Sequence, residues 1–418
     1  MTEAAEQTGA FADASAGAPQ QGTDVRSEPS GQPFDFDVTI VGAGPVGLAL
    51  AGWLARRSAT RALSVALIDA REPEDAASDP RSIAVSHGSR MILEPLRWPA
   101  DATAIQRIHV SQRGHFGRTL IDHAEHGLPA LGYVLRYGSI VHALADVVRT
   151  TPVHWFRSTT AQPPVQEDQG VTLRIESAHV TRALRTRLLV NAEGGLFHEQ
   201  QAREGDKRDY GQTALVGTVS VSAPQPHVAW ERFTSQGPVA LLPTGGVRGA
   251  DYALVWCCTP DEAARRAQLP DEAFLQELGA AFGDRMGRFT HIKGRAAFPL
   301  GLNTVDALVK GSVVAIGNAA QTLHPVAGQG LNLGLRDAHA LADALSQHGA
   351  TPLALAAFAR RRALDRRLTI GATDTLARFF TIDFPPLATL RGLALTALEF
   401  VPPVKTALAR QMMFGQRR

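Results

Sequence analysis

Asp37-Val-Thr-Ile-Val-Gly-Ala-Gly-Pro-Val-Gly47 is the stretch that decides the fold of this chain. Its first half is a short apolar run rich in β-branched residues, which predicts a buried parallel strand. Its second half is a Gly-x-Gly-x-x-Gly pattern. A helix over 48–57 and a second strand over 63–69 are expected to follow. Strand, glycines, helix and strand in this order predict a dinucleotide-binding fold.

Each residue of the glycine-rich turn has a physical role in binding a dinucleotide. Gly42 allows a sharp turn, Gly44 lets the backbone approach a pyrophosphate, and Gly47 lets the helix pack against the strand. Pro45 lies within the same turn and is predicted to contact the cofactor with them. Asp69 ends the second strand, where a carboxylate can accept hydrogen bonds from ribose hydroxyls. This half-motif leaves FAD and NAD open, and its place at the start of the ordered chain favours FAD by analogy only.

Two later segments add candidate cofactor contacts. Arg81, in Asp79-Pro-Arg-Ser-Ile-Ala84, is placed to reach a phosphate or the flavin edge, although an exposed loop arginine is the commoner situation. Much further on, a strand over 311–317 precedes a glycine-rich loop and a helix that continues to Leu345. The glycines there put bare backbone amides at the positive end of a helix, which suits the negative charge of a reduced flavin. The predicted contacts in this segment are Gly317, Asn318 (to the ribityl chain), Pro325, Gly328, Gly330, Leu331 and Asn332.

Together the three segments resemble the fingerprints of the class A flavoprotein aromatic hydroxylases, the group that contains para-hydroxybenzoate hydroxylase. Asn318 and Gln321 stand where most of that group has Asp and His, and this pattern resembles the ubiquinone-biosynthesis branch. The resemblance continues through 109–115, 230–238 and 369–374, and so covers nearly everything from residue 34 onward.

Two residues depart from the pattern of the group. Glu193 replaces the usual Asp after the central strand, and Arg136 stands where relatives often place Gln or Glu. No role is assigned to either residue. No catalytic base is nominated, and His324 is expected to be structural. No cluster of His, Cys and carboxylate residues has metal-ligand spacing.

The resemblance implies FAD as bound cofactor, NAD(P)H as a transient co-substrate, and O2. It further implies hydroxylation of a polyprenylated phenol of the 2-polyprenyl-6-methoxyphenol type, in ubiquinone biosynthesis. Such a substrate implies peripheral contact with a membrane or with a ubiquinone-biosynthesis assembly. The expected location is cytoplasmic or peripheral to the inner membrane. A FAD-dependent hydroxylase of another aromatic substrate is the alternative.

The predicted fold class is α/β, with a Rossmann-like FAD-binding domain, an antiparallel-sheet substrate domain and a C-terminal helical region. Residues 1–33 are poor in large apolar side chains and are expected to be disordered. The FAD-binding domain is predicted over 34–205 and 299–350, and the helical region over 351–418. Between them, 206–298 contains short strands separated by turns, which predict the substrate-binding sheet.

Composition excludes several classes of partner. The 418 residues contain 42 Lys plus Arg against 40 Asp plus Glu, so no electrostatic feature favours nucleic acid.

Cys257 and Cys258 are adjacent and are expected to be buried small hydrophobes in a reducing compartment. The arginines of 360–362 and 366–367 are expected on a solvated face. The segment 387–413 is either an amphipathic surface for membrane or partner contact or ordinary core packing.

Two rival functions are weaker. A reductase with two dinucleotide sites would show a second fingerprint and a Cys-x-x-Cys pair, and neither occurs. A non-catalytic prenyl carrier that kept the nucleotide fold would not need the flavin-facing segment from Gly317 to Asn332.

Overall fold

The computed structural model describes residues 33–114, 117–178, 180–194, 206–325, 328–381, 396–397 and 399–415. The predicted disorder of the N-terminal tail therefore falls almost wholly outside the described residues. Residues from Phe34 onward form one compact unit. That unit contains three sheets, and the predicted fold class is confirmed: a parallel nucleotide-binding sheet, an antiparallel sheet and C-terminal helices.

The first sheet is built around the strands that flank the glycine-rich turn. Its parallel part has the order β19-β12-β1-β2-β8, with bounds Val313–Ala315, Val180–Asn191, Phe36–Val41, Val65–Ile68 and His154–Phe156. Antiparallel strands extend it: β9 (Thr159–Ala161), β10 (Val165–Glu167), β11 (Gly170–Ser177) and β18 (Val309–Lys310). Both neighbours of β1 are parallel to it, so β1 is buried on both faces, as its apolar run predicts.

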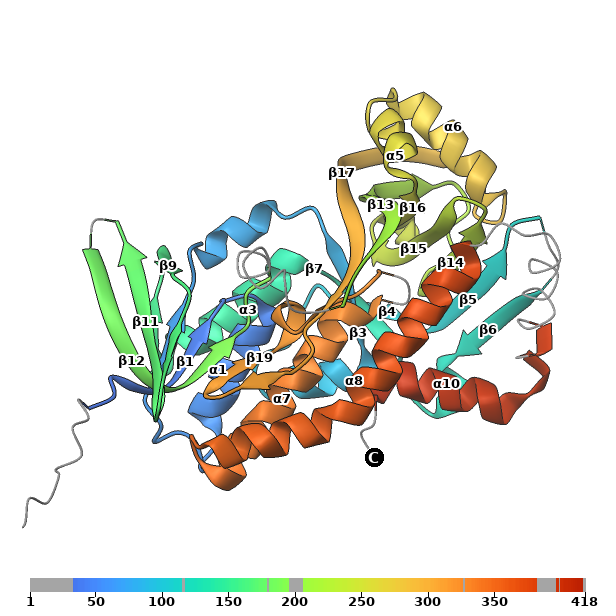
Figure 1. Ribbon diagram of the computed structural model, residues 1–418. Coiled ribbons are helices and arrows are strands. Elements are labelled where there is room, and N and C mark those ends of the chain that lie inside the picture. Colours follow the sequence, from blue (N-terminus) through green and yellow to red (C-terminus); the bar gives the residue numbers. More distant parts are fainter. Residues whose placement is uncertain are drawn as a thin grey trace, which may run out of the picture. The chain divides into compact units, whose positions relative to one another are not determined.

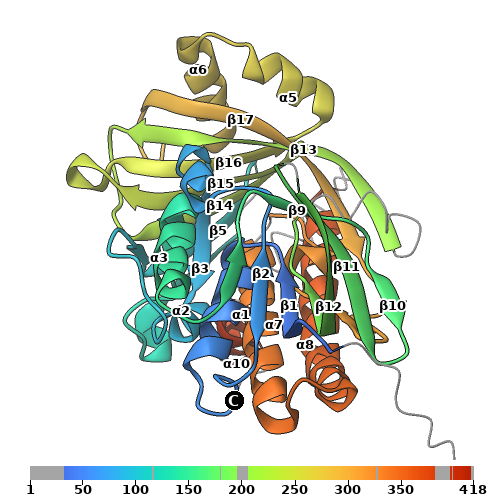
Figure 2. The same cartoon turned by 90° about the vertical axis from the view of Figure 1, so that its left-hand side faces the viewer.

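Helices pack side by side against this sheet. Helix α1 (Pro45–Arg56) contacts both α3 (Tyr137–Arg149) and α7 (Gln329–His348), and Figure 2 shows α1 and α7 behind the parallel strands. The α1 face that contacts the core consists of small and branched apolar residues such as Leu48, Ala51 and Leu54. The carboxyl ends of the strands and the amino ends of α1 and α7 therefore meet at one edge, where ligands of such sheets bind.

The second sheet has the order β20-β17-β13-β16-β15-β14-β5-β6. Its strands are β5 (Arg107–Gln112), β6 (Arg118–Asp122), β13 (Asp206–Val221), β14 (Val228–Thr234), β15 (Gly237–Gly245), β16 (Asp251–Cys258), β17 (Phe289–Thr304) and β20 (Gln321–Thr322). Helices α5 (Pro260–Ala267) and α6 (Asp271–Phe282) cover one of its faces (Figure 1). The division into domains stays a prediction, but β5 and β6 come from within 34–205 and still belong to this sheet. Local patterns do not reveal such a long-range pairing.

Strand register separates the second sheet into two faces. Side chains alternate along a strand, and paired residues share a face. Trp230, Leu241 and Leu254 lie on the face covered by α5 and α6. Glu231 pairs with Ala240, which pairs with Val255, so these three lie on the opposite face. The second face is the one that meets the nucleotide-binding part, as the lining of the cavity described below shows.

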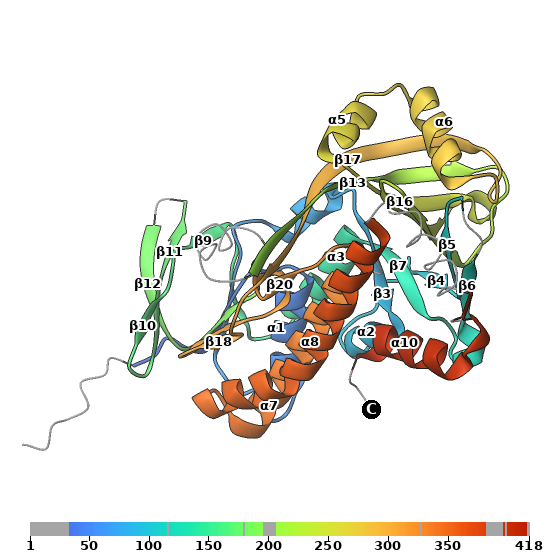
Figure 3. The same ribbon diagram turned by 45° about the vertical axis from the view of Figure 1, so that its right-hand side comes forward.

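The third sheet and the remaining helices complete the chain. The sheet has the order β3-β7-β4, with bounds Ser82–Ser86, Gly132–Arg136 and Thr103–Ile105. Helix α8 (Pro352–Thr381) packs along α7, and α10 (Pro402–Phe414) contacts α2 (His87–Leu93), as Figure 3 shows. Short 3₁₀ helices are η1 (Pro73–Ser78), η2 (His123–His126), η3 (Val247–Gly249) and η4 (Gly317–Ala319). No helix in the described part of the chain has both the length and the apolar character needed to cross a bilayer.

The expectation that the arginine run of α8 is solvated is wrong for two residues. Arg362 is 5% exposed and donates to Asp337 at 2.7 Å and to Asp365 at 2.5 Å. Arg366 donates to Gln321 at 2.9 Å and to two backbone carbonyls. These arginines face α7 and the η4 loop, whose carboxylates and carbonyls are distant in sequence, so the local charge pattern did not predict their burial. Arg360 is exposed as expected.

Other expectations fare better or lie partly outside the described chain. Cys257 and Cys258 are both buried and free, as predicted, and burial raises the pKa of each thiol. Of the segment 387–413, residues 387–395 are not described. In α10, Ala409 and Met413 are buried, whereas Val404 is exposed.

Candidate active site

A cavity of about 820 Å³ lies between the ligand-binding edge of the first sheet and the free face of the second. The nucleotide-binding part contributes the residues of both glycine-rich loops. The second sheet contributes Ala229, Glu231, Ala240, Leu242 and Val255. A polar groove of about 520 Å³ continues from the cavity, and the two share Gly44, Asp69, Arg71, Arg81 and Tyr137. An elongated ligand with a polar and an apolar end fits this arrangement.

The glycines of the first loop divide into supporting and lining residues. Gly42 has φ +107°, and a Cβ there would lie 2.7 Å from the backbone of Ala192. A Cβ on Gly47 would lie 1.9 Å from the Gly42 carbonyl oxygen, so only glycine allows α1 to start this close to the strand. A Cβ on Gly44 would meet only the Tyr137 hydroxyl, at 3.4 Å, and Gly44 lines the cavity. Gly42 and Gly47 therefore shape the loop, and Gly44 faces the ligand.

Helix α1 begins at this loop with Pro45 in its first turn and no side-chain cap at Gly44. Its first amides therefore point to the cavity with the positive end of the helix dipole, which suits a pyrophosphate. Asp69 closes the other side: Oδ2 accepts from Ala43 N at 2.6 Å, and Oδ1 accepts from Arg71 N at 2.8 Å. Both oxygens thus have backbone donors already. Each carboxylate oxygen can accept a further hydrogen bond. Because Asp69 also lines the cavity, ribose hydroxyls can supply it.

Arg81 lies where the cavity meets the polar groove. Its guanidinium is paired with Asp79, with nitrogen–oxygen distances of 2.5–3.1 Å. It also lies over the Tyr137 ring, 4.6 Å from the ring centroid. The hydrogen bonds to Asp79 raise the pKa of Arg81, so the residue remains cationic. Side-chain pairing and stacking therefore hold a positive charge at the place where a phosphate or flavin edge is expected.

The second glycine-rich loop supplies the opposite wall. Five of the residues predicted to contact the cofactor line the cavity: Asn318, Pro325, Gly328, Gly330 and Leu331. A Cβ on Gly330 would meet nothing within 4 Å, so the start of α7 presents open backbone to the cavity. Residues 326 and 327 of this loop lie outside the described chain.

Two residues of this segment that were predicted to contact the cofactor instead form hydrogen bonds within the protein. Asn332 is 2% exposed, accepts from Ser86 N at 2.8 Å, and donates to the carbonyls of Ala84 and Gly328. Gly317 N donates to Asp337 Oδ2 at 3.2 Å. Neither residue lines the cavity. Asn332 ties β3 to the start of α7, and Gly317 anchors the loop to buried Asp337.

Glu193, one of the two residues that depart from the pattern of the hydroxylases, lies in the cavity wall. Its Oε2 atom is buried and has no hydrogen-bond partner. Burial, and then the negative charge of Asp69, raise the pKa of this carboxyl to about 7. Arg136, the other departure, is exposed at the end of β7.

Sequence reasoning missed Glu231, Tyr137 and Arg71. Glu231 is the one ionisable residue among those that line the cavity from the described part of the second sheet. Strand alternation predicts that Glu231 and Arg232 point to opposite faces, but the sequence does not show which face meets the flavin.

His324 is fully buried, its Nε2 lies 3.0 Å from Gln212 Oε1, and burial lowers its pKa to about 4.

The residues present fit FAD. The N-terminal turns of two helices, α1 and α7, line one elongated cavity. The first suits the pyrophosphate, and the second suits the negative charge that a reduced isoalloxazine ring carries. The polar groove accommodates the nucleotide end, and the apolar sheet face leaves room for an aromatic ring beside the flavin. Fold and cavity together define a flavin-dependent oxidoreductase with a substrate pocket.

Comparison with known proteins identifies the family. Residues 35–363 match the family model described as FAD binding domain. An uncharacterized protein of Synechocystis, slr1300, is 34% identical over 91% of this chain and 93% of its own length. Ubiquinone hydroxylase UbiL of Rhodospirillum rubrum is 32% identical over 90% of this chain and 89% of its own length. The crystal structure of p-nitrophenol 4-monooxygenase PnpA from Pseudomonas putida has the same fold, with a TM-score of 0.72 and 15% identity over 92% of this chain and 99% of its own.

The chain therefore belongs to the family of FAD-binding monooxygenases. FAD is its cofactor, and enzymes of this class take their electrons from NAD(P)H.

Proposed function

We propose that this enzyme hydroxylates the aromatic ring of a polyprenylated phenol, with NAD(P)H as electron donor and O2 as oxygen source. One observation supports this most directly. One cavity is lined both by the predicted flavin contacts and by a mainly apolar sheet surface with a single carboxylate, Glu231. A planar phenol fits such a surface, because it is apolar on both ring faces and carries one polar group.

The apolar wall has a chemical purpose as well as a shape. Ala229, Ala240 and Val255 leave space next to the flavin position and bring no polar atom of their own side chains. FAD, when bound, supplies the electron transfer and oxygen activation that the protein's side chains cannot provide. The wall then keeps water from the reacting atoms and so limits loss of activated oxygen.

Glu231 is the candidate for orienting the phenol. Its strand register places it on the cavity face of β14, opposite Ala240. A carboxylate there can accept the hydrogen bond or the proton of the substrate hydroxyl, which increases the electron density of the ring. The hydroxylation needs such density, because the ring is the electron donor in the attack on oxygen. Proton acceptance by a positioned side chain typically contributes a factor of about 10²–10⁴.

The prenylated substrate is supported by resemblance. Relatives of this chain include ubiquinone hydroxylase UbiL, which is 32% identical and whose name refers to ubiquinone, a prenylated quinone. A polyprenyl substituent resides in a membrane, so we propose that the enzyme works at a membrane surface, cytoplasmic or attached to the inner membrane, or within a ubiquinone-biosynthesis assembly. Hydroxylation of a different aromatic compound by the same residues is the second candidate.

The test is product formation by the FAD-loaded enzyme under ¹⁸O2 with a prenylated methoxyphenol and NAD(P)H. The proposal expects a product with one ¹⁸O atom. Consumption of NAD(P)H that yields hydrogen peroxide without this product would contradict it. Glu231→Gln should keep its flavin and lose at least about tenfold in kcat, with a flattened acid limb in the pH profile. Glu272→Gln, at an exposed position of α6, is the matched control and should retain wild-type turnover.

A further inference from the structure

Strands β14, β5 and β6 lie side by side at one edge of the second sheet. Strand β5 pairs in parallel with β14, which sets Ser111 opposite Arg232. Strand β6 pairs with β5 on the other side, which sets Arg118 opposite Ser111. Because paired residues share a face, Arg118, Ser111 and Arg232 form a row on the face opposite to Glu231. This face is the one on which α6 lies.

Further arginines converge on the same row. Arg285, in the connection between α6 and β17, has its Nη1 atom 3.5 Å from Ser111 Oγ, and Arg232 Nη1 lies 3.2 Å from the same oxygen. Arg113 directly follows β5. Burial and the positive charges of Arg285 and Arg113 lower the pKa of Arg232, which shows how closely the charges are gathered. We call Arg113, Arg118, Arg232 and Arg285 the arginine cluster.

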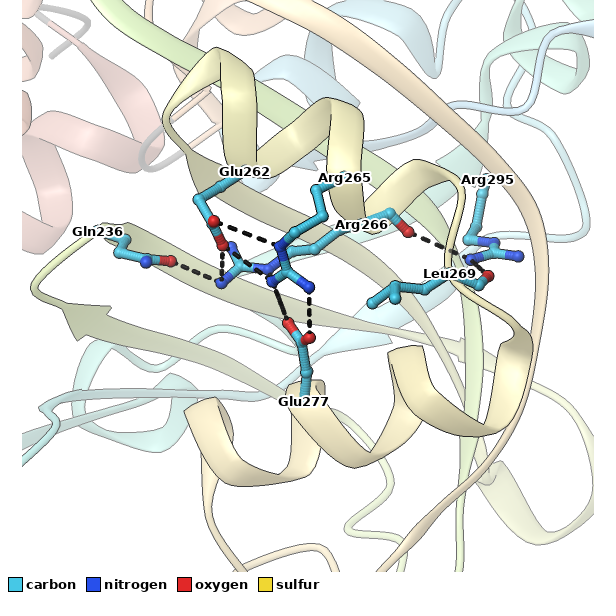
Figure 4. A network of polar contacts seen from close by, with 7 residues as sticks. All are labelled: Gln236, Glu262, Arg265, Arg266, Leu269, Glu277 and Arg295. Atoms are coloured by element: carbon cyan, nitrogen blue, oxygen red, sulfur yellow. Dashed lines mark hydrogen bonds and ion pairs between the residues drawn. The ribbon is translucent and has the colours of Figure 1, made fainter.

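The arginine cluster lacks negative partners among the residues that the structure describes. No carboxylate in the described part of the chain forms an ion pair with any of its four members. Elsewhere in the same sheet and its helices, three arginines are paired with carboxylates. Figure 4 shows Arg265 and Arg266 shared between Glu262 and Glu277. Likewise, Arg295 is paired with Asp271 at 2.9 Å.

Two buried nitrogen atoms in and beside the cluster also lack hydrogen-bond partners among the described residues. The Nε atom of Arg232 is buried and has no hydrogen-bond partner. His109, two residues before Ser111 on the same strand face, is 7% exposed, and its buried Nδ1 atom has no partner either. Buried polar atoms without a hydrogen-bond partner are rare in native proteins and call for a ligand or water. Three of the arginines are exposed, so an anion can reach the row from solvent.

We propose that the arginine cluster is a binding site for a phosphate group. Two guanidinium groups at one hydroxyl, those of Arg232 and Arg285, provide forked donors that match a tetrahedral dianion. The charge of a phosphate would relieve the mutual repulsion of the cluster. The phosphate belongs either to a soluble phosphoanion or to the headgroup of an anionic lipid. Since the cluster lies on the opposite sheet face from Glu231, the site is separate from the active cavity and does not depend on the proposed reaction.

Inorganic phosphate is the first probe, titrated into the FAD-loaded enzyme by calorimetry at constant ionic strength set with sodium chloride. The wild type should bind it, and the double variant R118Q/R285Q should bind at least tenfold more weakly. Arg288→Gln removes an exposed charge from the same loop and serves as the matched control, with wild-type affinity expected. Without phosphate, the double variant should have an equal or higher Tm, because it loses like-charge repulsion and no ion pair. Absence of phosphate binding by the wild type, or equal binding by the double variant, would overturn the proposal.

Vesicles separate the two sources of phosphate. Phosphatidic acid displays a phosphomonoester on a lipid surface, and phosphatidylcholine vesicles are the control. Sedimentation of the wild type with phosphatidic acid, lost in R118Q/R285Q and kept in Arg288→Gln, would identify a lipid headgroup. Binding of inorganic phosphate without selective sedimentation would identify a soluble phosphoanion.

Discussion

Glu193→Gln should stabilise the flavin-free protein relative to the wild type, and this gain in free energy of unfolding should be larger at alkaline than at acidic pH. The carboxyl of Glu193 lines the cavity with one oxygen buried and unpartnered. Burial and nearby Asp69 raise its pKa from 4.5 to about 7, and Arg71 opposes this in part. A glutamine has the same shape and no charge to desolvate, so the substitution isolates the effect of ionisation.

The sign of the effect follows from the direction of the pKa change. Below about pH 4.5 the carboxyl is neutral in the folded and unfolded states, and ionisation has no influence on stability. As pH rises to 7 and beyond, the unfolded carboxyl ionises freely, whereas the folded one ionises against burial and a neighbouring negative charge. The wild type therefore loses stability over the window from about 4.5 to about 7. At 1.36 kcal/mol per pH unit the full difference is about 3 kcal/mol, and the partial exposure of Glu193 reduces it to about 1–2 kcal/mol.

Urea unfolding of the flavin-free wild type and variant at pH 5 and pH 8 measures this difference. The advantage of Glu193→Gln in free energy of unfolding should widen by about 1 kcal/mol or more between the two pH values. Glu176→Gln, at an exposed position of β11, controls for removal of a charge and should show no comparable widening. An advantage for Glu193→Gln that is constant with pH, or that shrinks towards pH 8, would refute the reasoning.

Further substitutions separate the supporting residues from those that face the ligand. Gly47→Ala, whose Cβ would lie 1.9 Å from a carbonyl oxygen, should cost about 2–3 kcal/mol in urea unfolding. Gly44→Val should leave the unfolding free energy within about 1 kcal/mol of wild type and abolish flavin retention, measured by absorbance; full flavin content would remove Gly44 from the site. Asp337→Ala should cost about 3 kcal/mol, because buried Arg362 would keep only Asp365 as a partner; unchanged urea unfolding would show that the pair is dispensable.

Much of the nucleotide-binding part could be predicted from sequence because its determinants are local. The run from Asp37 to Gly47 combines a strand pattern with two positions, Gly42 and Gly47, that only glycine can occupy. The second glycine-rich loop is also local, and its residues Asn318 and Gly330 line the cavity. In such segments, strand period, helix start and ligand contact depend on neighbouring residues.

Features set by long-range pairing could not be predicted in this way. The side of β14 on which Glu231 lies depends on how β5, β14 and β15 align. Burial of Arg362 depends on Asp337, which lies one helix earlier. The hydrogen bonds of Asn332 to Ser86 and Ala84 in β3 likewise join residues about 250 positions apart. Alternation and charge runs describe each segment alone, so they leave these contacts undetermined.

The central claim is that the cavity between the two sheets holds FAD. The visible absorption spectrum of the purified protein tests it most directly, with the released cofactor identified after denaturation. We expect the bands of an oxidised flavin and release of FAD. A colourless protein that takes up no added FAD would contradict it.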